Sequence, residues 1–258
     1  MNPASSVSQT SIRLRGVAIP GAEDRQRRIP GFDQEVYSRS RVVCIGAGGL
    51  ISHIAPTLAR KGIGALTLLD GDLVEPSNLN RQRFYPGDVG RNKAIALAGN
   101  LQRECIAATG IRGLALHFEV ACERGMDLGC DVAICGVDNN PGRVAVARYF
   151  RGKGIPVIFA AVSADGDHGY VFRQGSTGAC LGCLYPDMVN DDRYPCPGTP
   201  AIADILQAVG SLAVYSVDAE LMNRRCAWNY RRISLSGEGA DGCGTVTVQQ
   251  NCALLDHA

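Results

Sequence analysis

The sequence predicts an α/β protein with a Rossmann-like, doubly wound and mostly parallel sheet, to which the C-terminal third adds antiparallel strands. Three observations predict this class. Short apolar runs alternate with amphipathic, helix-like segments from Arg41 to about Ser163. A glycine cluster separates the first apolar run from the first of these helices. Beyond Ser163, apolar and polar residues alternate in the manner of antiparallel strands.

The elements follow one another in a regular order. Within the parallel part we predict strands over residues 41–46, 65–70, 111–120, 131–136 and 155–162, and helices over 49–61, 91–105 and 141–153. The C-terminal third is predicted to contain antiparallel strands over 168–174, 231–237 and 245–250, with one long apolar helix over 201–222.

The two ends of this pattern define the expected domain organisation. Residues 1–24 are expected to form an N-terminal extension with one short strand within 11–19, and residues 24–40 a charged, helical lead-in. Residues 25–258 are then expected to form one continuous domain, with a crossover loop at about 187–200.

Composition excludes several classes of function. The chain has 258 residues, of which 46% are hydrophobic and 20% charged, and its formal net charge is +1, so no extended basic surface for nucleic acid is expected. Its apolar runs are too short to span a bilayer, and its N-terminus has no secretory apolar core, so we expect a cytoplasmic protein that binds no membrane. The eleven cysteines are then expected to be thiols, metal ligands or catalytic groups.

The glycine cluster predicts a nucleotide site. Gly46, Gly48 and Gly49 follow a buried strand and open a helix, where the backbone N–H groups can approach phosphate oxygens. Asp70 ends the second strand, in the position where an acidic residue holds ribose hydroxyls. This pattern alone leaves open whether the ligand is a dinucleotide used for hydride transfer or ATP, and a tight turn without any ligand is the simplest alternative.

The segment after the second strand favours ATP. Asp72, Asn78, Arg81 and Lys93 follow Asp70 within a short stretch. Hydride transfer needs no basic pair beside the acid, whereas attack on an α-phosphate does, because negative charge grows on the triphosphate. Each basic residue alone could equally be a solvated surface group.

A further acidic residue lies beyond another strand of the predicted sheet. Asp138 follows the strand over 131–136 and comes shortly before Pro141. A carboxylate at this edge could bind the Mg²⁺ that bridges phosphates. The same residue could instead cap the following helix, and the sequence leaves both possibilities open.

Several motifs taken together resemble those of the ubiquitin-activating enzyme superfamily. They are "GAGGLIS", "LLDGDLVEPSNLNRQ", "DVGRNKA", "CGVDN" and "ACLGCLYPD". The pattern is most similar to the short bacterial adenylyltransferases that activate molybdopterin-synthase and thiamine sulfur-carrier proteins. The resemblance runs from about Arg25 to the C-terminus, and residues 25–258 would form the adenylation domain.

The resemblance implies MgATP-dependent adenylation of the C-terminal glycine of a ubiquitin-like or sulfur-carrier protein, by a homodimer. Its implied site residues are listed by role. The nucleotide site would contain Gly46, Gly48, Gly49, Asp70, Asp72, Asn78, Arg81 and Lys93, with Asp138 on Mg²⁺ and Arg25 reaching into the partner subunit's site. The chain departs from the family pattern at Ile51, where a third glycine is usual, which implies altered packing between helix and strand.

The cysteines add two further expectations. Cys180 and Cys183 have a C-x-x-C spacing that suits Zn²⁺; a metal-free site or a redox dithiol are the alternatives. The family closes this site near the C-terminus, where this chain offers Cys252 with His257 or Asp256, and Cys243 is another possible ligand. Cys196 stands where the resemblance places an acyl-accepting cysteine, so we expect transfer of the carrier to it as a thioester.

Two other functions stay open at this point. An NAD(P)-dependent oxidoreductase would explain the glycines and Asp70, but not Arg81, Lys93 or the C-x-x-C pair. A catalytically silent scaffold that binds a ubiquitin-like protein would not need the acids and bases. If adenylation is the function, a separate conjugating enzyme or sulfurtransferase is expected to complete the reaction.

Overall fold

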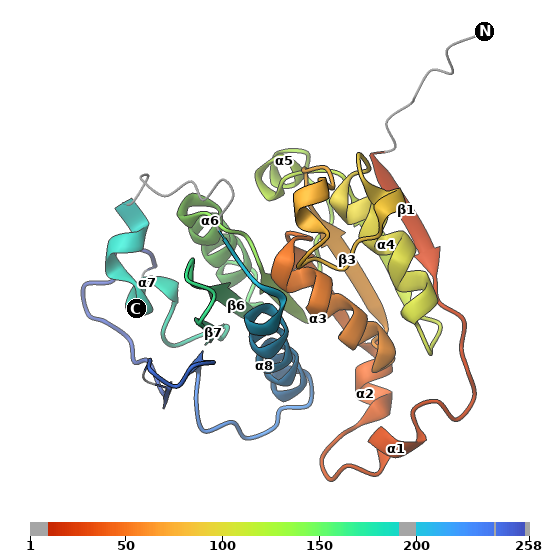
Figure 1. Cartoon of the computed structure of the whole chain (residues 1–258). Coiled ribbons are helices and arrows are strands. Elements are labelled where there is room, and N and C mark those ends of the chain that lie inside the picture. Colours follow the sequence, from red (N-terminus) through yellow and green to blue (C-terminus); the bar gives the residue numbers. More distant parts are fainter. Residues whose placement is uncertain (1–9, 191–199, 240, 256–258) are drawn as a thin grey trace, which may run out of the picture.

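The protein folds around one large twisted sheet, and the computed structural model describes residues 10–190, 200–239 and 241–255 of it (Figure 1). Within these residues the sheet has nine strands in the order β1-β4-β3-β2-β5-β6-β7-β8-β9. The strands are β1 (Ser11–Arg15), β2 (Arg41–Ile45), β3 (Ala65–Leu69), β4 (Gly110–Leu114), β5 (Val132–Cys135), β6 (Val157–Val162), β7 (His168–Gln174), β8 (Tyr230–Ser234) and β9 (Gly242–Gly244).

The pairing of the strands confirms the predicted fold class. The strands from β4 through β3, β2 and β5 to β6 pair in parallel, whereas β7, β8 and β9 are antiparallel additions. β2 lies between β3 and β5, so the chain winds outward from β2 in both directions. A crevice for a ligand is expected at the carboxyl end of such a switch point.

Helices cover both faces of the sheet and bury a core against each (Figure 1). The long helices α3 (Gly49–Arg60), α4 (Lys93–Glu104) and α8 (Ala203–Leu221) pack on one face. On the other face lie α5 (Phe118–Glu123), α6 (Asn140–Arg151) and the short α7 (Leu181–Leu184). Successive residues of β2 alternate between the two cores, because a strand points its side chains to opposite faces: Cys44 belongs to the first core and Val43 and Ile45 to the second.

The strand expected over residues 111–120 is wrong in its second half. β4 ends at Leu114, and the chain turns into α5 at Phe118. Phe118 and Ala121, one helical turn apart, are both buried. The ring of Phe118 meets that of Tyr149 on α6 edge-on, with centroids 5.4 Å apart. Packing against α6 therefore stabilises a helix instead of a strand in the segment that begins at Phe118.

The strand expected over 245–250 is also wrong. The last strand is β9, which ends at Gly244. Immediately beyond it, the backbone N–H of Val246 donates to Asn229 Oδ1 at 2.7 Å, and Asn229 Nδ2 donates to the Val246 carbonyl at 2.9 Å. A side chain thus takes up the backbone groups that a longer strand would have paired.

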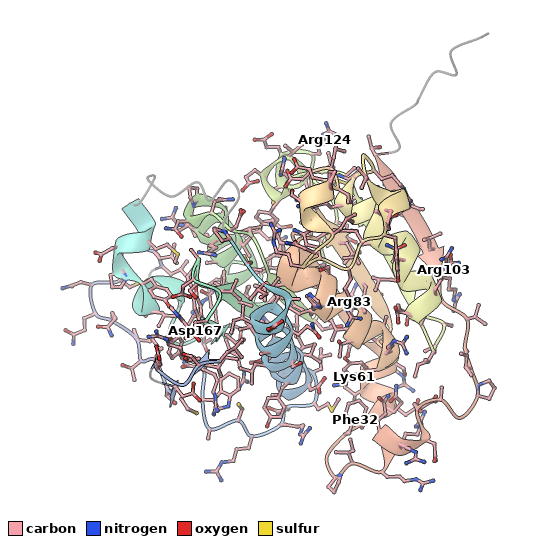
Figure 2. All side chains as sticks on the ribbon, viewed as in Figure 1. Phe32, Lys61, Arg83, Arg103, Arg124 and Asp167 are labelled. Carbon is pink, nitrogen blue, oxygen red and sulfur yellow. The ribbon has the colours of Figure 1, made fainter. Side chains whose placement is uncertain are left out.

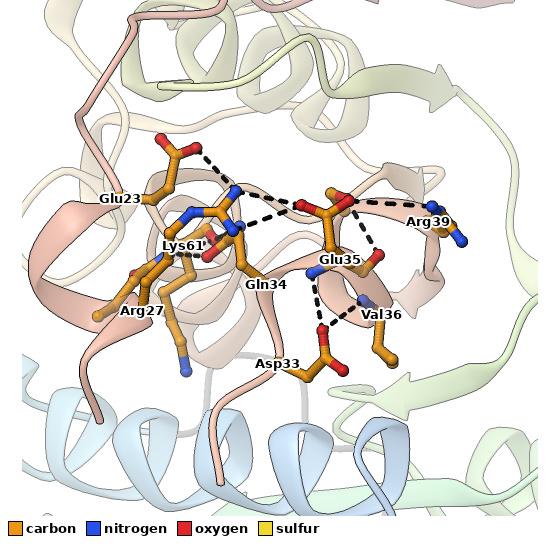
Figure 3. A network of polar contacts seen from close by, with 10 residues as sticks. Glu23, Arg27, Asp33, Gln34, Glu35, Val36, Arg39 and Lys61 are labelled. Carbon is orange, nitrogen blue, oxygen red and sulfur yellow. Dashed lines mark hydrogen bonds and ion pairs between the residues drawn. The ribbon is translucent and has the colours of Figure 1, made fainter. Parts of the chain in front are cut away.

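The N-terminal region contributes both a strand and two short helices. β1 lies within the expected extension and pairs antiparallel with β4 at the edge of the sheet. The helical lead-in is divided into α1 (Asp24–Arg27) and α2 (Gln34–Arg39), because Asp33 caps a new helix by accepting from the N–H groups of Glu35 and Val36 (Figure 3). The division of the chain at residue 24 stays a prediction.

A buried ion pair anchors this lead-in to the rest of the domain. Lys61, at the end of α3, pairs with Asp218 on α8, and their side chains are 20% and 8% exposed. The Lys61 ammonium lies 5.2 Å from the ring centroid of Phe32, and both residues are labelled in Figure 2. It lies 5.3 Å from the ring centroid of Tyr37. Gln34 Nε2 donates to the Lys61 carbonyl at 3.1 Å (Figure 3). The C-terminal ends of α3 and α8 are thereby fixed to each other and to α2.

No helix in the described part of the chain is both long enough and apolar enough to cross a membrane. Three short 3₁₀ helices complete the described elements: η1 (Pro76–Asn78), η2 (Pro86–Asp88) and η3 (Pro186–Asn190).

Candidate functional site

Two adjoining cavities lie at the carboxyl ends of the parallel strands. The smaller has a volume of about 300 Å³ and the larger about 600 Å³. The smaller is lined by the glycines and acids that the sequence singled out, namely Gly46, Gly48, Gly49, Asp70, Asp72, Lys93 and Asp138. The larger shares several of these residues and adds Asn78 and Arg81. The structure therefore brings the residues expected of a nucleotide site to one place.

The glycine loop is shaped by the strand beside it. Gly46 has a φ of +91°, a conformation that favours glycine, and a Cβ there would lie 3.2 Å from the Gly136 carbonyl oxygen. Gly48 precedes α3 as its N-cap residue. A Cβ on Gly49 would lie 3.1 Å from the side chain of Leu206 on α8. The loop is thus held tightly at the start of α3, whose N-terminus is suited to an anion.

Asp70 fixes this loop to the end of β3. Its Oδ2 accepts from the Ala47 N–H at 2.7 Å, and its Oδ1 accepts from the Asp72 N–H at 2.8 Å. Burial raises the pKa of the Asp70 carboxyl above its ordinary value, although Lys93 and these two donors oppose the shift. Asp70 therefore organises the backbone around the smaller cavity.

An ion pair crosses the site between Asp72 and Lys93. Lys93 Nζ lies 3.0 Å from Asp72 Oδ2, and the Lys93 N–H donates to the Asp72 carbonyl at 2.9 Å. Asn92 Nδ2 donates to the carbonyls of both Asp70 and Asp72. The start of α4 is thereby tied to the end of β3, so that a lysine ammonium faces both cavities.

Asn78 and Arg81 lie on the loop between β3 and α4. Asn78 is buried, and its Oδ1 accepts from the Glu75 N–H at 3.0 Å, so it shapes the loop. Arg81 Nη1 donates to the Ser77 carbonyl at 2.7 Å and to Asn80 Oδ1 at 3.1 Å. Its guanidinium is thus held by its own loop at the wall of the larger cavity.

Asp138 is exposed to both cavities, and the alternative of a helix cap is wrong for it. The cap of α6 is its neighbour Asn139, whose Oδ1 accepts from the Gly142 N–H at 2.8 Å. Among the described residues the Asp138 carboxylate has no hydrogen-bond or ion-pair partner, so its oxygens are available to a cation.

Several residues that line the cavities were not singled out from the sequence, and three of them carry polar groups that suit a nucleotide. Gln82 lines both, Arg143 the larger and His117 the smaller. Gln82 belongs to the quoted "SNLNRQ" stretch, which could have drawn attention to it. His117 gave no signal, because its ring is brought over the backbone of Gly71 by folding alone, where a Cβ would lie 2.3 Å from its Nε2.

The predicted metal site is partly assembled on the face of the sheet that α5, α6 and α7 cover. The sulfur atoms of Cys180, Cys183 and Cys252 all lie within 4.8 Å of one another. Cys180 Sγ is 3.8 Å from Cys183 Sγ and 3.3 Å from Cys252 Sγ. Tetrahedral Zn²⁺ with bonds of about 2.3 Å holds its sulfurs about 3.8 Å apart, so the cluster fits that ion. Cys243 is exposed on β9 and lies outside the cluster.

One predicted site residue, Arg25, is not brought to these sites, and two others cannot be placed because they lie outside the described residues. Arg25 is exposed on α1, beside the C-terminal end of α3, about 18 Å along that helix from the glycine loop. Arg25 lines neither cavity in its own chain. Cys196 and His257 lie outside the described residues, and so does Asp256.

Comparison with known proteins finds a matching family and several similar proteins. Residues 23–233 match the ThiF family. The sulfur carrier protein adenylyltransferase of Thermus thermophilus is 31% identical over 189 residues, which cover 69% of this chain and 68% of that protein. The SAMP-activating enzyme E1 of Haloferax volcanii is 31% identical over 173 residues, covering 65% of this chain and 61% of that one. The chain thus spans less than two thirds of the length of the Haloferax relative.

Solved structures share the fold at low sequence identity. Escherichia coli MccB with ATP superposes with a TM-score of 0.68 at 20% identity, covering 86% of this chain and 68% of MccB. PaaA superposes with a TM-score of 0.70 at 19% identity, covering 96% of this chain and 79% of PaaA.

Proposed function

The chain belongs to the ThiF family, and we propose that it is an ATP-dependent adenylyltransferase that activates the C-terminal glycine of a ubiquitin-like or sulfur-carrier protein. One observation carries this proposal. Acidic and basic side chains that suit a nucleoside triphosphate meet at two joined cavities, which offer room for a nucleotide and for a second reactant. The names of the Thermus and Haloferax relatives support the choice of carrier.

We place ATP in the smaller cavity and the tail of the carrier in the larger. The N–H groups of the glycine loop and the Lys93 ammonium would hold the phosphates, and Asp70 and Asp72 would face the ribose. Ala160, Ala161 and Val162 of β6 line the larger cavity. Their side chains are apolar and small, so they leave room along this wall for an extended tail of glycine residues.

The reaction transfers the adenylyl group to the tail. A carboxylate oxygen of the terminal glycine forms a bond to the α-phosphorus, and the bond to the bridging oxygen breaks as pyrophosphate leaves. Negative charge spreads over the phosphate oxygens during this step, and Arg81 and Lys93 would stabilise it. Asn78 would act by keeping the Arg81 loop in place.

Magnesium is the cation that this site would use. Asp138 would hold it, because its exposed carboxylate faces both cavities and has no partner among the described residues. When bound, Mg²⁺ supplies charge neutralisation between phosphate groups. An oxygen ligand at this position agrees with the preference of that ion.

We propose that Cys196 then accepts the activated carrier as a thioester. The segment after the region that holds Cys196 re-enters the described structure at Pro200, and Ala201 lines the larger cavity. A thiolate would attack the acyl carbon and release AMP. A separate conjugating enzyme or sulfurtransferase would take the carrier from there.

Zinc is the second cation that we propose. Cys180, Cys183 and Cys252 would be ligands, and His257 would supply the fourth position. The backbone N–H of Gln249 donates to Cys183 Sγ at 3.4 Å, as outer contacts of metal thiolates do. Such a site would bind the C-terminal segment to α7 and serve a structural role.

We also propose a homodimer that places Arg25 of each chain in the site of the partner. Arg25 lies beside the C-terminal end of α3, whereas the glycine loop precedes the N-terminal end of that helix, so Arg25 is too far away to act within its own chain. A second copy of the chain could bring its Arg25 to the phosphates. Buried thiols such as those of Cys44 and Cys135 suit a reducing compartment, and we propose the cytoplasm.

Carrier-dependent exchange of pyrophosphate into ATP tests the proposal. Purified protein is mixed with MgATP, labelled pyrophosphate and ubiquitin-fold carriers that end in Gly-Gly. Exchange is expected with at least one carrier, and none with the same carrier after replacement of its last glycine by aspartate. Exchange that does not depend on that glycine would exclude this function.

A further inference from the structure

The segment Arg81–Arg83 is fixed to the first turns of α3 on both sides of its central residue. His53 Nε2 lies 2.9 Å from the Arg81 carbonyl oxygen, and Ser52 Oγ accepts from the Arg83 N–H at 3.2 Å. Arg83, labelled in Figure 2, also donates from Nε to His53 Nδ1 at 3.3 Å. This contact fixes the imidazole with its Nε2–H toward the Arg81 carbonyl. The two neighbours of Gln82 are therefore held against the helix that begins at the glycine loop.

Gln82 itself points into the site. Its side chain is buried, with 9% of the residue exposed, yet it lines both cavities. Its Oε1 has no hydrogen-bond partner among the described residues. Its Nε2 is the end that faces the glycine loop, 4.0 Å from where a Cβ on Gly48 would lie. Burial of the Oε1 acceptor without a partner is unfavourable, so this side-chain position is not explained by stability, and it leaves the Nε2 donor turned toward the glycine loop.

We infer that Gln82 is a further catalytic residue, whose Nε2–H donates a hydrogen bond to a nonbridging oxygen of the α-phosphate. The inference rests on the proposed adenylation. Phosphate oxygens are acceptors, and the glycine loop is where they are expected to lie. Gln82 borders both cavities, so its amide stands at the junction where the carboxylate of the tail would meet the α-phosphorus.

The amide differs in its chemistry from Arg81 and Lys93. It carries no charge and keeps both protons throughout, while the bond to the tail forms and pyrophosphate leaves with the bonding electrons. Its contribution grows as charge accumulates on the nonbridging oxygens. Because the donor is already positioned by the contacts of His53 and Ser52, little reorganisation is needed during the reaction.

The variant Gln82→Leu tests the inference, because leucine keeps the volume and removes the donor. We expect pyrophosphate exchange to fall about 10²-fold and the affinity for the MgATP analogue AMPCPP, measured by calorimetry, to fall about tenfold. The melting temperature is expected to stay equal or rise, since a buried amide oxygen without a partner is replaced by an apolar group. Gln82→Glu is expected to lose more activity, because a carboxylate repels phosphate.

Gln102→Leu is the matched control. Gln102 is an exposed residue of α4 whose Nε2 donates to the Arg15 carbonyl at 3.3 Å and which lines neither cavity, so this variant is expected to behave as the wild type. Unchanged exchange and unchanged AMPCPP affinity in Gln82→Leu would overturn the inference. A loss of free energy of unfolding as large as the loss of free energy of AMPCPP binding would also overturn it, because damage to the fold would then explain the weaker binding. If the wild type binds AMPCPP but no carrier supports exchange, the proposed adenylation fails; a tenfold weaker Gln82→Leu would then still support a phosphate contact.

Discussion

The side chain of Ile51 occupies the space that Gly136 leaves open. A Cβ on Gly136 would lie 2.7 Å from Ile51 Cγ1, which is closer than real contacts allow. Ile51 is fully buried on α3, and Gly136 directly follows β5. The isoleucine that departs from the family pattern is thus matched by a glycine just beyond the end of β5, and Gly46 of the glycine loop also lies against Gly136.

This match predicts that Gly136→Ala destabilises the protein by about 1–3 kcal/mol, the usual effect of overpacking. Urea unfolding of the single variant measures the change. In the double variant Ile51→Ala/Gly136→Ala the added methyl group has room, so the effects of the two substitutions should not add. Additive effects would show that the two residues do not share this space.

The ion pair of Lys61 and Asp218 predicts a large effect of a single substitution. Lys61→Met should lower the free energy of unfolding by about 3–5 kcal/mol, because Asp218 would remain buried without its partner. Burial already raises the pKa of Asp218, and Lys61 opposes this shift. Urea unfolding is again the measurement. Arg60→Met removes a neighbouring pair whose arginine is 64% exposed, and a change below about 1 kcal/mol is expected for it.

The cysteine cluster predicts bound zinc. Elemental analysis of purified protein should find about one zinc per chain, and Cys252→Ser should lower this value and the melting temperature. Cys243→Ser is the control, since Cys243 is exposed and outside the cluster. Wild-type protein that is fully stable without zinc would refute the structural role.

The proposed thioester predicts that adenylation and transfer can be separated. Cys196→Ala should retain pyrophosphate exchange and lose a carrier adduct that thiol reductants release. Denaturing gels without reductant and mass spectrometry detect this adduct. If Cys196→Ala forms an adduct of the same size, another residue accepts the carrier. If the wild type forms no adduct, the reaction ends at the adenylate.

The sequence predicted the parallel part of the fold well, for a physical reason. β2 and β5 are buried on both faces and read as continuous apolar runs, and α3 and α4 show one apolar face. The errors lie where tertiary contacts decide. Phe118 could extend a strand or begin a helix until α6 is in place, and the pairing of Val246 with the Asn229 side chain cannot be read from local pattern.

Some residues of the candidate site could likewise be predicted from the sequence, and others could not. Asp70 directly follows β3, Asp138 comes shortly after β5 and Lys93 begins α4, so the sheet edge that gathers them was predictable. Gln82 and His117 reach the cavities through loop geometry that no periodicity reveals. The alternative of a helix cap for Asp138 was removed only by seeing Asn139 take that role.

Exchange of pyrophosphate in Asp138→Ala tests the central claim most directly. Asp131→Ala is the matched control, because Asp131 stands just before β5 and Asp138 shortly after it, at opposite edges of the sheet. We predict that carrier-dependent exchange falls at least about 10²-fold in Asp138→Ala and stays near the wild-type rate in Asp131→Ala. Wild-type exchange in Asp138→Ala, in folded protein, would contradict the account.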